Sequence, residues 1–142
     1  MNRARLATPL LVSILFVLGA CSPGGTVTPT GPASTLGPRP SSPATVQILQ
    51  PSSGATLSGT SVHVVLQLTG GQIVTQTTTA IRPDQGHVHL YVDNVLVSMN
   101  YGLEQDITVH PGTYVLKAEF VAADHAPFSP RVLSQEVFFT VK

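Results

Sequence analysis

The stretch Gly86-His87-Val88-His89-Leu90-Tyr91-Val92 decides the fold, because aliphatic side chains alternate along it with histidine and tyrosine. Successive side chains of a β-strand point to opposite faces, so this period of two predicts a half-buried strand. We expect Val88, Leu90 and Val92 to face the core, and the two histidines and the tyrosine to face the other side.

The same alternation recurs on both sides of this stretch, between clusters of Gly, Pro, Asp and Asn that are typical of turns. The spacing of an amphipathic helix does not occur convincingly among residues 44–142. We therefore predict seven strands, at Thr45–Leu49, Val62–Leu68, His87–Val92, Val95–Met99, Asp106–Val109, Tyr114–Ala122 and Leu133–Val141.

About seven short strands within 99 residues predict an all-β fold, an immunoglobulin-like antiparallel β-sandwich. The segment His110-Pro111-Gly112-Thr113-Tyr114 resembles the turn into the sixth strand of many bacterial immunoglobulin-like modules. In those modules the tyrosine hydroxyl bonds back to upstream backbone. The resemblance therefore implies structural roles for Gly112 and Tyr114.

The N-terminal residues resemble a bacterial lipoprotein signal peptide, whose lipobox cysteine is diacylated and becomes the new N-terminus. Arg3 and Arg5 precede a 13-residue apolar segment, and Leu18-Gly19-Ala20-Cys21 has the form of a lipobox. The apolar segment is shorter than the roughly 20 residues that a spanning helix needs. The resemblance implies that residues 1–20 are a signal peptide and that a lipidated Cys21 anchors the protein on the extracytoplasmic face of the cell membrane or outer membrane.

Residues 21–43 are expected to form a disordered tether. Eighteen of the 22 residues from Ser22 to Pro43 are Pro, Gly, Ser or Thr, a composition that cannot bury enough apolar surface to offset the entropy of ordering. The predicted domain is 44–142, whose four basic and seven acidic residues give a net charge of 4 − 7 = −3. This mildly acidic balance disfavours nucleic acid as a partner.

Two segments contain the residues with possible chemistry. Gly86-His87-Val88-His89 and Asp124-His125-Ala126-Pro127 together resemble an exported bacterial family of unknown function, which has a Gly-His-x-His strand and a second histidine segment before its last strand. The resemblance implies that His87, His89 and His125 correspond to the histidines of that family. Val88 stands where the family often has a further histidine.

Strand geometry suggests that these histidines meet. Residues i and i+2 of a strand share a face, and the strand of His87 pairs in such sandwiches with the strand that precedes His125. Three imidazoles, with Asp124 as a fourth ligand or an outer partner, would suit Zn(II) or Cu(II). The alternative is that the histidines are ordinary surface residues and that Asp124 caps its loop.

Other metal sites and catalytic motifs receive little support. Cys21 is the only cysteine, so the mature domain has no thiol for a cupredoxin site and no disulfide. A two-residue hairpin at Asp93-Asn94 would place Met99 on the core side with Val88. His63 and His110 are expected away from the cluster, and no nucleophile or phosphate-binding motif occurs.

The sequence leaves three functions open. The first is a non-enzymatic interaction module at the cell envelope, which binds an unidentified protein or small ligand. The second is Cu or Zn binding through His87, His89 and His125, and the third is a metal-dependent hydrolase at the same residues. A metal site requires the three histidines to converge, whereas a pure interaction module predicts diverging histidines and an exposed apolar patch.

Overall fold

The structure is a computed structural model that describes residues 38–142, and every regular element in this range is a β-strand. The expected signal peptide, Cys21 and most of the expected tether lie outside the described residues. The strands are β1 (Thr45–Gln50), β2 (Ala55–Leu57), β3 (Ser61–Thr69), β4 (Gln72–Ile73), β5 (Gln85–Val92), β6 (Val95–Ser98), β7 (Glu104–Thr108), β8 (Gly112–Ala122), β9 (Pro127–Leu133) and β10 (Val137–Val141).

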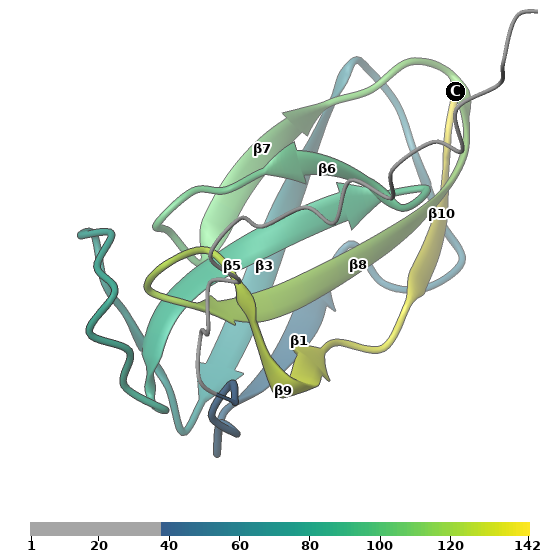
Figure 1. Ribbon diagram of the computed structural model, residues 1–142. Helices are drawn as coiled ribbons and strands as arrows, with labels where there is room; N and C mark the ends of the chain where they lie inside the picture. Colours follow the sequence, from purple (N-terminus) through teal and green to yellow (C-terminus); the bar gives the residue numbers. More distant parts are fainter. Residues whose placement is uncertain (1–37) are drawn as a thin grey trace, which may run out of the picture. The chain divides into compact units, whose positions relative to one another are not determined.

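The strands form two layers, which confirms the predicted immunoglobulin-like β-sandwich (Figure 1). One sheet has the order β1-β3-β7, and the other has the order β2-β10-β8-β5-β4, with β6 added to β5 and β9 added to β8. Almost the whole of β5 pairs in antiparallel fashion with the Leu116–Ala122 part of β8, and the two strands form the centre of the larger sheet.

Alternating aliphatic side chains of the two sheets fill the space between the layers. Val88 and Leu90 of β5 are fully buried there, as the period of two predicts, and they pack with Phe120 of β8. The ring of Phe120 also stacks on that of Phe128 in β9, with centroids 5.5 Å apart. The side chains of His87 and His89 therefore lie on the other face of β5, away from this core.

The prediction of one last strand over Leu133–Val141 is wrong, because β9 ends at Leu133 and β10 begins only at Val137. At the break, the Ser134 amide donates to the carbonyl oxygen of Ala118, and the Ser134 hydroxyl accepts from the Ala118 amide. The sequence analysis also missed β2 and β4, which have three and two residues. Strands this short cannot show a period of two.

The hairpin at Asp93-Asn94 forms as predicted, but Met99 does not join the core. Both turn residues have positive φ angles of 49° and 66°, and Val92 pairs with Val95. The register then shifts at Leu90/Tyr91, and β6 ends at Ser98. Met99 therefore lies beyond the strand with 51% of its surface exposed.

Tyr114 makes the bond that defines a tyrosine corner. Its hydroxyl donates to the carbonyl oxygen of His110 across 2.9 Å, and its ring lies 5.4 Å from that of Phe139. A Cβ atom on Gly112 would lie 3.2 Å from the Tyr114 hydroxyl, so the glycine leaves room for the ring. Gly112 and Tyr114 thus both contribute to the structure of this turn.

The ordered contacts of the domain begin before Ala44, the expected boundary. Arg39 binds the β8–β9 loop, and the carbonyl oxygen of Pro40 accepts from the Ser129 amide across 3.0 Å. The tether was therefore predicted to extend a few residues too far, because composition does not reveal these contacts. Among the described residues, the structure contains no helix with the length and hydropathy needed to cross a membrane.

Candidate functional site

The register of β5 and β8 places the Gly-His-x-His motif. Gly86 lies opposite Ala122, His87 opposite Val121 and His89 opposite Glu119. A Cβ atom on Gly86 would lie only 1.8 Å from the carbonyl oxygen of Val121, so only glycine permits this approach of the two strands. The motif glycine therefore sets the spacing at the end of the sheet where His87 lies.

The loop between β8 and β9 brings His125 over the same face. The His125 amide donates to the carbonyl oxygen of Ala122 across 2.9 Å, and the Ala122 amide donates to that of Ala126 across 3.0 Å. His125 itself has a φ of 63°, in the left-handed region that histidine adopts more readily than most residues. This tight turn directs the His125 ring back onto β5.

All three histidines meet in one cluster, as strand geometry suggested. The His125 ring stacks on His87 with centroids 4.3 Å apart and on His89 with centroids 5.5 Å apart. The Nε2 atom of His89 lies 3.2 Å from Nδ1 of His125. His87 is completely buried and His89 is 4% exposed, so these are not the surface histidines of the alternative interpretation.

His87 has one ring nitrogen without a partner. Its Nε2 lies 3.2 Å from the carbonyl oxygen of Ala123, which can only accept, so Nε2 carries the proton. In the neutral ring, Nδ1 then holds a lone pair, and this buried atom has no hydrogen-bond partner in the structure. Unpartnered buried polar atoms are uncommon in folded proteins and call for an explanation.

The surroundings favour uncharged imidazoles. Burial is the main cause that lowers the pKa of His89, and the neighbouring His125 lowers it further against the opposing effect of Glu119. Burial likewise lowers the pKa of His125, with His87 as the next cause and Asp124 acting in the opposite direction. His89 and His125 are therefore neutral at pH 7, the state in which histidine binds metals.

Asp124 does not join the histidines, and its expected place as a fourth ligand is not what the structure shows. Its Oδ2 accepts from Nη1 of Arg39 across 2.6 Å, and its Oδ1 accepts from Nη2 across 2.9 Å. Oδ1 also accepts from the Ala126 amide across 3.1 Å, as a loop cap does. Hydrogen bonding from Arg39 is the main cause that lowers the pKa of Asp124.

Three neighbours of the cluster were not predicted. The Thr77 hydroxyl lies 3.1 Å from Nε2 of His125, and the Tyr101 ring meets His87 edge-on with centroids 4.9 Å apart. Both come from irregular loops, where periodicity gives no signal. Glu119 could have been found, because the pairing of β5 with β8 puts it directly opposite His89.

The cluster is not a preassembled coordination shell. Among residues 38–142, no group of three or more His, Cys, Asp or Glu side chains is placed so that it could hold a metal ion as it stands. The reason is that the rings stack, so their nitrogens do not point to one centre. Rotation of the rings about their side-chain bonds would be required for all three to coordinate one ion.

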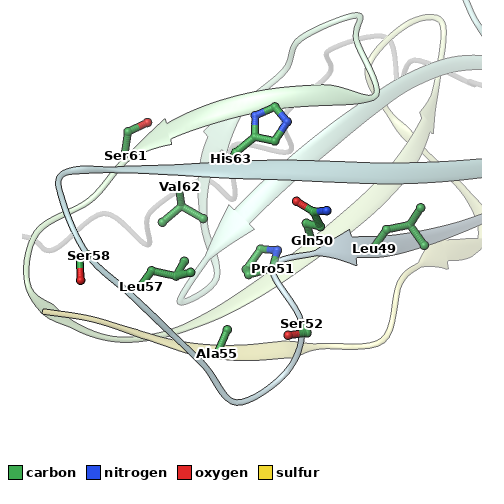
Figure 2. Close-up of a pocket in the computed structure, with 10 residues that line it drawn as sticks. All are labelled: Leu49, Gln50, Pro51, Ser52, Ala55, Leu57, Ser58, Ser61, Val62 and His63. Carbon is green, nitrogen blue, oxygen red and sulfur yellow. The ribbon is translucent and has the colours of Figure 1, made fainter.

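A pocket of about 550 Å³ lies elsewhere, at the edge of the sandwich between β1, β2 and β3 (Figure 2). Figure 2 shows Val62 and His63 on opposite sides of β3, with Val62 turned toward Leu57. His63 is the one titratable residue that lines the pocket, and its Nδ1 lies 2.9 Å from Oδ1 of Asp106. The pocket therefore lacks a cluster of titratable groups.

Comparison with known proteins adds little. No protein-family model and no curated protein matches this chain. A search of solved structures finds fibronectin(III)-like modules of Clostridium thermocellum CbhA, with 23% sequence identity and a TM-score of 0.47. The match covers 68% of this chain and 45% of the solved chain, less than half of the length of that protein.

Proposed function

We propose that this protein is a lipid-anchored, non-enzymatic binding protein of the cell envelope, and that its domain binds a Cu or Zn ion through His87, His89 and His125. The observation that supports the proposal is the convergence of three histidines from two distant segments, together with the buried Nδ1 atom of His87, which has no hydrogen-bond partner. A metal site requires the three histidines to converge, whereas a pure interaction module does not.

The spacing of two ring nitrogens suits a shared ion. Two nitrogens bound at about 2.0–2.1 Å to a tetrahedral metal are about 3.3 Å apart. His89 Nε2 and His125 Nδ1 lie 3.2 Å apart in the metal-free cluster, where a proton occupies the space between them. An ion that replaces this proton would take the lone pair of His87 Nδ1 as its third protein ligand, after rotation of the rings directs the three nitrogens to one centre.

Binding without catalysis fits the surroundings better than hydrolysis does. Tyr101 covers one side of His87, and Thr77 occupies the outer nitrogen of His125. The pockets of about 550 and 580 Å³ are both lined by other residues and do not border the histidines. A metal-dependent hydrolase would require a substrate cleft beside the ion.

The anchor is part of the proposal. The lipobox Leu18-Gly19-Ala20-Cys21 supports lipidation of Cys21, and two acyl chains hold a protein stably on a membrane. The domain would then act on the extracytoplasmic side of the cell membrane or the outer membrane. Lipidation and cleavage should change the mass of the protein. Globomycin, which inhibits cleavage of lipoprotein signal peptides, should prevent this change, and Cys21→Ser should abolish it.

Calorimetric titration of residues 22–142 with Zn(II) and with Cu(II) tests the metal proposal. This fragment keeps every described residue and omits Cys21, so no thiol competes. We expect one ion per chain with micromolar or tighter affinity, and at least a tenfold loss in His125→Asn. Asparagine also adopts the left-handed conformation, so this change removes the ligand while it keeps the turn.

His63→Gln and His110→Gln are the matched controls, because both histidines lie outside the cluster. Each should bind the ion as the wild type does. Absence of binding, or equal weak binding by the wild type and His125→Asn, would overturn the proposal.

A second candidate is docking of a protein at the edge of β6. Five of the exposed large apolar residues in 38–142 belong to this strand and the loop that follows, namely Val95, Leu96, Val97, Met99 and Tyr101. No charged residue protects the edge, and such edges pair with a further strand, for instance that of a second copy. Sedimentation measurements test pairing with a second copy. Self-association of the wild type that is abolished in Val97→Lys would support docking at this edge. A wild type that is monomeric at all concentrations would exclude a second copy as the partner.

A further inference from the structure

Arg39 fastens the start of the described chain to the loop that contains His125. Its guanidinium donates to both carboxylate oxygens of Asp124, across 2.6 and 2.9 Å. It also donates from Nη2 to the carbonyl oxygen of Ala126 and from Nε to that of Pro127, each across 2.9 Å. One side chain thus makes four hydrogen bonds to the residues immediately around His125.

The residues held by Arg39 are those that shape the turn. Asp124 Oδ1 also accepts from the Ala126 amide, so the carboxylate links the guanidinium to the backbone on the far side of His125. The carbonyl oxygen of Ala126, which Arg39 contacts, in turn accepts from the Ala122 amide at the base of the turn. Because these atoms are held in place, the backbone is fixed on both sides of His125, whose φ is 63°.

The planar guanidinium is suited to this task. A bidentate arginine–carboxylate pair restricts orientation as well as distance, which a lysine cannot do. The side chains of Arg39 and Asp124 are 23% and 19% exposed, so water screens their pair less than a pair on an open surface. A residue stays in the left-handed conformation where its surroundings hold it there, as the contacts of Arg39 and Asp124 do for His125.

We propose that Arg39 is a positioning residue for His125. By holding the turn in place, Arg39 sets the geometry of the histidine cluster and its affinity for the ion. This inference rests on the proposed function. Arg39 itself donates only to oxygen atoms and would not touch the ion, so its effect would pass through Asp124 and the turn.

The test compares Arg39→Ala and Arg39→Lys with Arg82→Ala in residues 22–142. Arg82 is an exposed arginine outside the loop, so its removal changes the net charge equally and leaves the turn intact. We expect Arg39→Ala to weaken Cu(II) binding about tenfold and to change the Cu(II) electron paramagnetic resonance spectrum. Arg39→Lys should restore part of the affinity, and Arg82→Ala should match the wild type.

A second readout does not depend on the metal. Hydrogen exchange of the His125 and Ala126 amides in the metal-free protein should accelerate in Arg39→Ala, whereas the amides of β3 should keep their protection. Wild-type affinity and spectrum in Arg39→Ala would overturn this inference and leave the metal site standing. Absence of binding by the wild type would instead remove the proposed function, and the inference with it.

Discussion

The Nε2 atom of His89 and the Nδ1 atom of His125 lie 3.2 Å apart, so a single proton occupies the space between two imidazoles from different segments of the chain. A second proton on this pair would place two N–H groups against each other in a largely buried site. His125 is accordingly the second cause, after burial, that lowers the pKa of His89.

Stability of the metal-free protein should therefore fall on acidification. The fold lowers the pKa of His89 and of His125 below the value of about 6.5 expected in the unfolded chain. Below that pH the unfolded state binds more protons, so this contribution to stability is complete above about pH 7 and is lost as the pH falls through the folded pKa values. Urea unfolding with a chelator at pH 7.5 and 5.5 measures the loss. The loss should shrink in His89→Gln/His125→Asn, and an unchanged loss there would contradict the assignment.

Gly86→Ala should destabilise the sandwich by about 3 kcal/mol, because overpacking at a site that cannot expand costs up to this amount or more. The new Cβ atom would lie 1.8 Å from the carbonyl oxygen of Val121, and the backbones of β5 and β8 would have to separate. Thermal or urea unfolding measures the change. Gly102→Ala is the control, since its Cβ atom would come no closer than 3.2 Å to the nearest atom, the carbonyl oxygen of Glu104 at the start of β7.

Arg131→Ala should cost about 2 kcal/mol, because it leaves the buried carboxylate of Glu119 without its cation. Arg131 donates from Nε to Oε1 of Glu119 across 2.6 Å, and the Tyr91 hydroxyl donates to Oε2 across 3.1 Å. Breaking a fully buried pair costs about 3–5 kcal/mol, but Arg131 is half exposed, and water screens part of the interaction. Glu119→Gln should recover stability in the Arg131→Ala background; a further loss would show that the charge is not the cause.

Tyr114→Phe should lower the free energy of unfolding by about 1 kcal/mol, the usual contribution of one hydrogen bond. The change removes the bond to the carbonyl oxygen of His110 and keeps the ring against Phe139. Urea unfolding gives the value, with Tyr101→Phe as a control of the same chemistry. Equal stability of Tyr114→Phe and the wild type would show that water satisfies the His110 carbonyl as well as the tyrosine does.

The sequence was sufficient to predict the sandwich and the meeting of the histidines. The alternation at 86–92 located the central strand, and antiparallel pairing with 114–122 followed from the fold class, so His125 was expected beside His87. The side-chain partners were harder to predict. The ion pair of Arg131 with Glu119 was not predicted, although a period of two places Glu119 on the outer face of β8.

Features set by irregular backbone were not predictable in this way. Arg39 lies in a Pro- and Ser-rich segment whose composition indicates disorder, and only the folded β8–β9 loop reveals its partner. Met99 was assigned to the core because an ideal hairpin register would place it there. The register shift at Leu90/Tyr91 depends on packing across the sheet, which a pattern of apolar residues does not specify.

The start of the described chain, coloured dark blue, and the C-terminus lie at opposite ends of the described domain (Figure 1). The Lys142 amide bonds to the Leu57 carbonyl oxygen beside β10, far from the histidines. A fluorescent reporter or affinity tag fused after Lys142 should therefore leave the cluster undisturbed. A fusion that replaces the residues before Ala44 would remove the Arg39 contacts, so fragments for crystallography or labelling should begin upstream of Pro38.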